Sequence, residues 1–230
     1  MIALADCNNF FASCERSIRP ELEGKPIVVL SNNDGCIIAR SNEAKALGYK
    51  MGEPVFKVKD KLLRDRVHMF SGNMALYRDI SEKIMCILRS ECNAIEVYSI
   101  DEAFMDFTSV AAAEEKAELL RVQVLKETKI PISIGIAKTK VLAKLASHIA
   151  KKHSRRGVFK LHNKDLIERA LSYYSVEELW GVGRKQTQFL NDKGIFQASQ
   201  LAQADEAWLR RHMSILGVRM ARELNGIPCF

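Results

Sequence analysis

The chain has 230 residues and a formal net charge of +7, with 47% hydrophobic and 27% charged residues. This composition is ordinary for a globular protein with one large domain or two to three small ones. No apolar run approaches the ~20 residues that a membrane helix needs, and no basic segment followed by an apolar core opens the chain. We therefore expect a cytoplasmic protein without a membrane partner. The six cysteines form no C-x-x-C pair, which argues against a zinc site or a disulfide scaffold.

The first third of the sequence predicts a strand, a helix and then a hairpin. Residues 1–5 form a short apolar run that ends at Asp6, and residues 8–18 have helical spacing of apolar side chains. The apolar runs 27–30 and 36–39 flank a polar segment that contains Asp34-Gly35, which is a strong hairpin signal. A short helix is expected over residues 41–48, ended by Gly48.

The remaining elements predict an α+β sheet domain followed by a helical region. An amphipathic helix is expected over 75–92, strands over 95–100 and 104–107, a helix over 111–127, a strand over 132–136 and a helix over 139–152. Past residue 165 the strand signals stop and short helices take over, with residues 161–163 leading to a domain boundary.

Positive charge is concentrated late in the chain. Residues 138–160 contain eight basic side chains and no acidic one. A basic run is often only a solvated helix face. Its position beside a helix-loop-helix signal, in the most basic third of the chain, favours a polyanionic partner.

Three acidic residues stand at the ends of apolar strands. Asp6 closes the first strand, and Asp101 and Glu102 lie between the strands at 95–100 and 104–107. Burial of an unpaired carboxylate is unfavourable, so a cation is the expected partner, and hard oxygen ligands suit Mg²⁺. A bend at the hairpin tip would let all three clamp two Mg²⁺ ions for phosphoryl transfer. The alternative is that Asp101 and Glu102 are exposed turn residues and Asp6 is a helix N-cap.

Several motifs, in order along the whole chain, resemble the Y-family translesion DNA polymerases. The resemblance is nearest to the UmuC type, the catalytic subunit of bacterial DNA polymerase V. It rests on segments 6–15 (DCNNFFASCE), 99–104 (SIDEAF) and 135–146 (GIAKTKVLAKLA). The hairpin at 31–40 (SNNDGCIIAR) and the segment 180–184 (WGVGR) are similar to that subfamily as well.

The resemblance implies a right-hand polymerase arrangement within the α+β class. The palm would comprise residues 1–10 and 74–164, the fingers 11–73 and an all-α thumb with a helix-hairpin-helix 165–230. Family members normally continue into a further DNA-gripping domain, the little finger. This sequence stops at Pro228-Cys229-Phe230, so we expect that the little finger is absent and that the chain is a fragment.

The resemblance also implies a role for each candidate catalytic residue. Asp6 and Asp101 would bind both Mg²⁺ ions, Glu102 would bind the catalytic ion near the primer 3′-hydroxyl, and the carbonyl of Cys7 would contact the nucleotide-bound ion. Lys45 and Lys151 match triphosphate-binding positions. The family often has Arg where this chain has Lys45, and Tyr where it has Asn42; lysine keeps the charge but loses the bidentate fork.

Further residues match nucleotide- and DNA-binding positions of the family. Phe11 would lie under the sugar and exclude a 2′-hydroxyl, with Phe10 beside it; alternatively, both rings belong to the core. Gly35 and Cys36 would roof the replicating base pair, or they serve turn chemistry alone. The helix-hairpin-helix would bind DNA phosphates through its glycine backbone and first basic residues. These residues are Gly181, Gly183, Arg184 and Lys185.

The sequence thus predicts an error-prone DNA polymerase that adds dNTPs to a primer opposite damaged template in the SOS response. By resemblance, its partners would be primer–template DNA, dNTP, processed regulatory subunits, a recombinase filament and a sliding clamp. The alternatives are a catalytically silent scaffold of a lesion-bypass complex, a nucleotide cyclase and a DNA-binding module. The intact set of acids argues against the scaffold, and the basic segment is unneeded in a cyclase.

Overall fold

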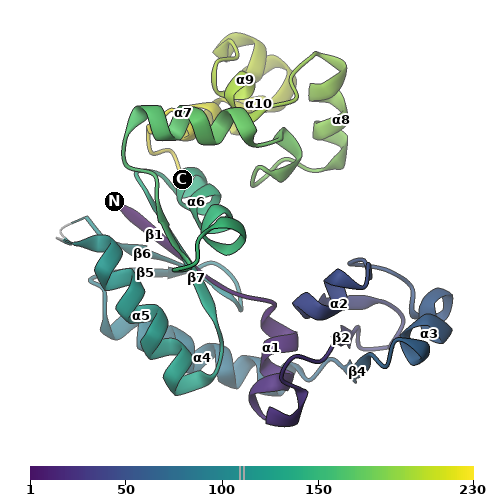
Figure 1. Cartoon of the computed structure of the whole chain (residues 1–230). Coiled ribbons are helices and arrows are strands. Elements are labelled where there is room, and N and C mark those ends of the chain that lie inside the picture. Colours follow the sequence, from purple (N-terminus) through teal and green to yellow (C-terminus); the bar gives the residue numbers. More distant parts are fainter. Residues whose placement is uncertain (109, 111) are drawn as a thin grey trace.

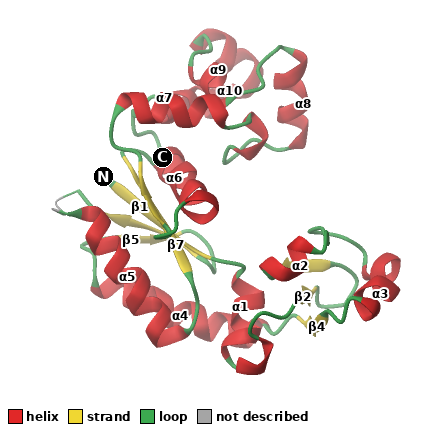
Figure 2. Ribbon diagram, in the orientation of Figure 1, coloured by secondary structure: helices red, strands yellow, loops and turns green. Residues whose placement is uncertain are grey.

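The computed structural model describes residues 1–108, 110 and 112–230. The protein consists of two sheets, each with its helices, and a separate helical region (Figure 1). Helices and strands are mixed as in the α+β class (Figure 2). The larger sheet has five strands in the order β5-β6-β1-β7-β8. Their bounds are β1 Ile2–Cys7, β5 Ile95–Val97, β6 Glu102–Asp106, β7 Ile132–Ala137 and β8 Val158–Lys160.

Strand β1 is the centre of this sheet and is antiparallel to both neighbours. Ala3, Ala5 and Cys7 face a core shared with helices α4 (Met74–Ser90) and α5 (Ala113–Thr128). Leu4 faces the opposite core, which includes helix α6 (Lys140–His153). Alternate residues of a strand point to opposite faces, so Asp6 lies on the same face as Leu4, the face covered by α6.

The smaller sheet has three strands in the order β3-β2-β4 and lies beside helix α1. β2 and β3 form the expected antiparallel hairpin, and β4 joins β2 in parallel. Val28, Ile37, Tyr49 and Leu62 belong to its own small core. The bounds in this region are α1 Phe10–Ser17, β2 Ile27–Leu30, β3 Ile37–Arg40, α2 Asn42–Ala46, α3 Val55–Arg64 and β4 His68–Ser71.

The C-terminal region is helical and shares a continuous apolar core with α6. Glu223 of its last helix is fully buried and accepts a hydrogen bond from the backbone N–H of Val141, at 3.0 Å, in the first turn of α6. A carboxylate at a helix N-terminus satisfies free N–H groups and complements the helix dipole. The bounds are α7 Lys164–Tyr173, α8 Arg184–Asp192, α9 Ala198–Ala202 and α10 Glu206–Leu224.

The observed elements differ from the expected ones in a few places. β1 continues through Asp6 to Cys7, so Asp6 lies within the strand, and it is not a helix N-cap because α1 is preceded by Asn9. Helix α3 and strands β4 and β8 were not expected. The helix expected over 111–127 is observed as Ala113–Thr128, and residue 111 lies outside the described residues.

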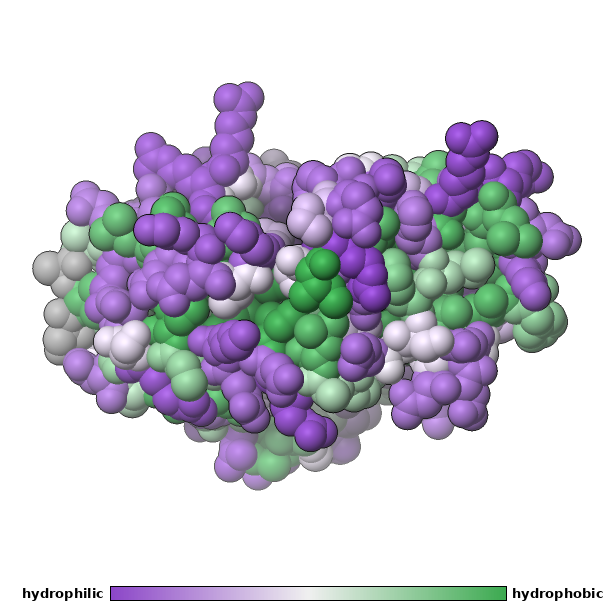
Figure 3. All heavy atoms as spheres, turned by 90° about the horizontal axis from the view of Figure 1, so that it is seen from below, coloured by the Kyte–Doolittle hydropathy of each residue, from purple (hydrophilic) through white to green (hydrophobic). Residues whose placement is uncertain are grey.

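Polar side chains cover much of the face seen in Figure 3, with apolar groups between them. Among the described residues, no helix combines the length and the apolarity that crossing a membrane requires.

Candidate active site

Two of the predicted carboxylates lie side by side on the large sheet. Asp6 of β1 is directly opposite Glu102 of β6 in the antiparallel register. Phe104, two residues after Glu102, belongs to the core on the α6 side, so the Glu102 side chain also lies on that face. Like charges placed opposite each other across strands are destabilising, and a compensating positive charge is therefore expected nearby.

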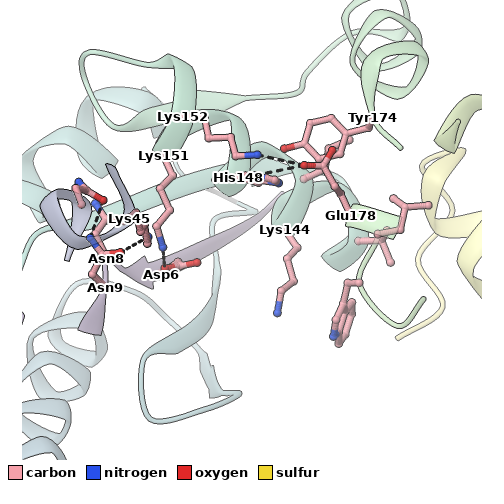
Figure 4. A pocket seen from close by; sticks show the side chains of 15 residues that line it. Asp6, Asn8, Asn9, Lys45, Lys144, His148, Lys151, Lys152, Tyr174 and Glu178 are labelled. Atoms are coloured by element: carbon pink, nitrogen blue, oxygen red, sulfur yellow. Dashed lines mark hydrogen bonds and ion pairs between the residues drawn. The ribbon is translucent and has the colours of Figure 1, made fainter. Parts of the chain in front are cut away.

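Helix α6 supplies that positive charge through two lysines. Lys151 Nζ lies 2.8 Å from Asp6 Oδ1, and Lys144 Nζ lies 2.9 Å from Glu102 Oε2. Figure 4 shows Lys151 pointing from the helix onto Asp6. The two lysines are seven residues apart, which is two helical turns, so they project from one face of α6. The spacing of the lysines therefore matches the pair of carboxylates.

Glu102 is the more enclosed of the two carboxylates, with 15% of its side chain exposed against 23% for Asp6. Burial raises its pKa, and the hydrogen bond and charge of Lys144 oppose that shift without cancelling it. The Lys144 ammonium also lies over the rings of Tyr98 and Trp180, at 4.7 and 5.4 Å from their centroids. The indole N–H of Trp180 donates to the Tyr98 hydroxyl at 2.9 Å. The helical region thus contacts the large sheet beside Glu102.

Asp101 lies in the bend that precedes β6. Its backbone carbonyl accepts a hydrogen bond from Cys7 N–H at 2.9 Å, which joins the bend to the end of β1. The Ser99 hydroxyl donates to Asp101 Oδ1 at 2.6 Å. Asp101 and Glu102 could share a site only if the chain bends between the strands that flank them. This bend is present.

Cys7 lies beneath this bend and is 3% exposed. Burial raises the pKa of its thiol well above the usual range, and the charges of Asp101 and Asp6 raise it further. A thiol in this environment stays protonated and is a poor metal ligand. The part of Cys7 that suits a hard cation is accordingly its carbonyl oxygen.

One cavity brings most of the predicted nucleotide-binding residues together. It is bordered by Asp6, Cys7, Asp101, Phe10, Phe11, Lys45 and Lys151. Phe10 is 4% exposed and belongs mainly to the core of the large sheet, whereas Phe11 is only partly buried. The alternative that both rings are core residues therefore holds for Phe10 more than for Phe11.

Lys45 reaches this cavity from α2, in the small-sheet region. Its ammonium donates to the side chain of Asn9, and Asn9 in turn donates to Asn42 Oδ1 at 2.9 Å. Burial lowers the pKa of Lys45, and the nearby charges of Lys151 and Arg40 lower it further. A cation that has other cations close by favours binding of an anion between them.

A second cavity adjoins the first, and Asp6, Asn9 and Lys45 line both (Figure 4). It lies between α6 and the segment 174–180 of the helical region. Glu178 Oε1 of that segment lies 3.2 Å from Lys152 Nζ and 4.0 Å from His148 Nε2. The ring of His148 meets that of Tyr174 edge-on, with 5.1 Å between centroids.

Other predicted residues lie apart from the first cavity. Gly35 is exposed and Cys36 half-buried in the loop between β2 and β3, where the Cys36 N–H donates to Ser31 Oγ at 3.2 Å. The part of this hairpin that lines the cavity is Ile38–Arg40 of β3. The alternation of β3 places Ile38 and Arg40 on one face and could have pointed to these two. Gly181, Gly183, Arg184 and Lys185 are exposed at the start of α8, in the helical region.

Several cavity residues were not predicted from the sequence. Asn9, Arg40, Lys144, His148, Lys152 and Glu178 all line one of the two cavities. Four positions of α6, residues 144, 148, 151 and 152, are spaced so that they lie on one face of the helix. This spacing is visible in the sequence and could have identified Lys144, His148 and Lys152.

The donor set has the chemistry that Mg²⁺ requires. Asp6, Asp101 and Glu102 offer carboxylate oxygens and Cys7 a carbonyl oxygen, which are the hard ligands this ion prefers. Among the described residues no three His, Cys, Asp or Glu side chains are already drawn together in the manner of a metal cluster. Asp6 and Glu102 are engaged by lysines instead, so metal binding would involve rearrangement of these ion pairs.

The fold is that of the Y-family DNA polymerases. The chain superposes on an insertion ternary complex of Dbh DNA polymerase with a TM-score of 0.82 and 26% sequence identity, covering 97% of this chain and 68% of that one. It also superposes on DinB from Sulfolobus solfataricus with a TM-score of 0.80 and 27% identity, covering 97% of this chain and 67% of the other.

Residues 5–148 match the impB/mucB/samB family, and the chain belongs to that family. It is 47% identical over 234 residues to the protein UmuC of Salmonella typhimurium, covering 100% of this chain and 56% of the relative. The chain thus spans about half the length of this relative. The resemblance to Y-family polymerases of the UmuC type is confirmed.

Proposed function

We propose that this chain carries the nucleotidyl-transfer site of a translesion DNA polymerase of the UmuC type. The observation that carries the proposal is the convergence of Asp6, Asp101, Lys45, Lys151 and Phe11 on one cavity. Acids and cations that line the same cavity suit a substrate with a triphosphate and bound divalent ions. Family membership and the likeness to a polymerase ternary complex support the same assignment.

Each residue then has a defined task in the addition of a dNTP to a primer. Lys45 and Lys151 bind and orient the triphosphate, and the ring of Phe11 lies against the deoxyribose and excludes a 2′-hydroxyl by its bulk. Asp6, Asp101 and Glu102, with the Cys7 carbonyl, would hold two Mg²⁺ ions. When bound, these ions supply charge neutralisation and increase the acidity of the primer hydroxyl. Phosphoryl transfer depends mainly on such positioning and charge compensation.

The three regions correspond to the hand-like parts of a polymerase in this proposal. The five-stranded sheet with α4, α5 and α6 is the palm, residues 1–10 and 74–164. The three-stranded sheet region, residues 11–73, is the fingers, with Gly35 and Cys36 near the replicating base pair. The helices from 165 to 230 are the thumb. Gly181, Gly183, Arg184 and Lys185, exposed before and at the start of α8, bind DNA phosphates as a helix-hairpin-helix.

The partners proposed for the whole protein follow from its family. They are primer–template DNA and dNTP at the cavity, and processed regulatory subunits, a recombinase filament and a sliding clamp during the SOS response. These substrates and partners lie in the cytoplasm, the compartment that the sequence also predicts.

Replacement of Asp101 by Asn tests the proposal directly. The rate at which dNTPs extend a primed template in the presence of Mg²⁺ should fall by about 100-fold or more, because the substitution removes a charged group that stabilises the transition state. The matched control is Asp106→Asn in the same strand region, where the carboxylate is exposed and bonded to Thr108. This variant should extend primers like the wild type. If Asp101→Asn extends primers as well as the wild type does, the catalytic assignment is wrong. The protein would then be a scaffold or a DNA-binding module.

A further inference from the structure

A second aromatic ring lies directly behind Phe11. Tyr77 of α4 is fully buried, and its ring stacks on that of Phe11 with 4.5 Å between centroids and 18° between planes. The ring of Phe10 also contacts that of Phe11, with 5.7 Å between centroids and 48° between planes. Phe11 lines the cavity that holds the acids and lysines, whereas Tyr77 does not line it. Tyr77 therefore supports the Phe11 ring from the protein side.

Tyr77 is itself fixed by a buried carboxylate, that of Glu15. Its hydroxyl donates to Glu15 Oε1 at 2.6 Å, and Glu15 is only 2% exposed. The other carboxylate oxygen pairs with Arg19, which lies four residues later, just past the end of α1. A buried carboxylate is stable only when its oxygens are satisfied, and here each oxygen has one partner. Burial raises the pKa of Tyr77, so its hydroxyl remains a proton donor.

Phe11 is held in place by apolar contacts alone. Its side chain has no polar group, so its position depends on the surfaces that it contacts. The helix that carries it has only eight residues, and its N-cap Asn9 has a left-handed backbone and no side-chain capping bond. An apolar surface that can yield rejects an added hydroxyl only weakly, by roughly 100-fold. Strict exclusion of a ribose therefore requires a ring that cannot move back.

We propose that Tyr77, anchored by Glu15 and Arg19, is a positioning residue that fixes how far the Phe11 ring extends into the cavity, and thereby sets the discrimination between deoxyribose and ribose. The inference rests on the proposed function, because it takes Phe11 as the residue facing the sugar. Tyr77 acts through Phe11 and does not itself line the cavity that holds Asp6, Asp101 and the lysines.

The test compares insertion of dATP and ATP opposite template thymine, as the ratio of their kcat/KM values. Tyr77→Phe and Glu15→Gln keep the ring and remove or weaken its anchor. Each should lower the discrimination ratio by about threefold to tenfold, the equivalent of one hydrogen bond, chiefly by improving ATP use. Tyr77→Leu removes the flat support and should lower the ratio further. Thermal unfolding of each variant shows whether it is folded at the assay temperature.

Tyr49→Phe is the matched control. Tyr49 is 2% exposed and its hydroxyl donates to the carboxylate of Asp65 at 2.8 Å, but it belongs to the core of the small sheet. Its variant should keep the wild-type ratio. If folded Tyr77→Phe and Glu15→Gln also keep that ratio, the inference is overturned while the proposed function stands. A wild-type protein that inserts no dATP would instead overturn the proposed function, and this inference with it.

Discussion

Gly135 allows helix α6 to lie directly against strand β7. A Cβ atom at this position would lie 2.0 Å from Ser147 N and 2.3 Å from Ala143 O, both backbone atoms of α6. Real Cβ atoms do not approach backbone so closely, so any side chain here would push the helix away from the sheet. The lysines that face Asp6 and Glu102 are on that helix.

Gly135→Ala should therefore destabilise the protein by at least 1–3 kcal/mol, roughly the cost of overpacking a core. Urea unfolding followed by circular dichroism measures this change as a lower midpoint. Gly183→Ala is the control, because Gly183 has an extended backbone with φ of −88° and open space where its Cβ would be. Equal midpoints for the two variants would contradict the close contact between α6 and β7.

At the scale of elements, α6 meets the helical region through His148. Burial lowers the pKa of His148 below its ordinary value of 6.5, and the charge of Lys152 lowers it further. Lys151 acts in the same direction, whereas Glu178 and Asp6 oppose the shift. The imidazole is accordingly neutral in the folded protein near pH 7. It lies close to the ammonium of Lys152 and the carboxylate of Glu178.

This shift predicts how stability depends on pH. On acidification the unfolded chain takes up a proton at His148 near pH 6.5, before the folded protein does, so the free energy of unfolding falls as pH drops below that value. In His148→Gln this contribution should be missing, and stability should change less between pH 7.5 and about 5.5. His162→Gln, at an exposed position, should retain the wild-type slope. Identical slopes for all three proteins would rule out the assigned role of His148.

The sequence predicted elements well where apolar spacing was long and regular. The helices at α1, α4, α5 and α6 and the hairpin of β2 and β3 were all expected. Strands β4 and β8 have only four and three residues, and they join the sheets by parallel pairing with distant segments, which no local pattern reveals. Helix α3 did carry a signal, because Val55, Val58 and Leu62 have helical spacing.

The composition of the candidate site was predictable, but its internal pairing was not. Asp6 and Glu102 were recognisable as acids in apolar surroundings, and Lys151 was recognised by resemblance. Their contacts depend on the register of β1 against β6 and on the packing of α6 over both strands. A one-residue slip of that register would carry an acid to the opposite face. The contact between Phe11 and Tyr77 joins residues that are 66 positions apart, and no local sequence pattern predicts it.

At the scale of the whole molecule, the net charge of +7 predicts DNA binding that is sensitive to salt. Each phosphate contact made by a basic side chain releases condensed counterions, so the logarithm of the binding constant falls linearly with the logarithm of salt concentration. Arg184→Ala and Lys185→Ala should each weaken binding and make this slope shallower by about 1.

Fluorescence anisotropy with a labelled primer–template at several salt concentrations measures the slope. Lys126→Ala, an exposed lysine on α5 of the large-sheet region, removes the same charge elsewhere and serves as the control. An equal change in slope for all three variants would mean that the start of α8 has no special part in binding DNA.

The bond between Glu223 and the first turn of α6 has a consequence for how the protein is made. Lys151 follows its partner Asp6 by 145 residues, and Glu223, which caps the helix of Lys151, comes later still along the chain. Contacts between residues so distant along the chain form slowly and late in folding. On the ribosome, Asp6 would therefore emerge long before the helix that neutralises it is completed and capped.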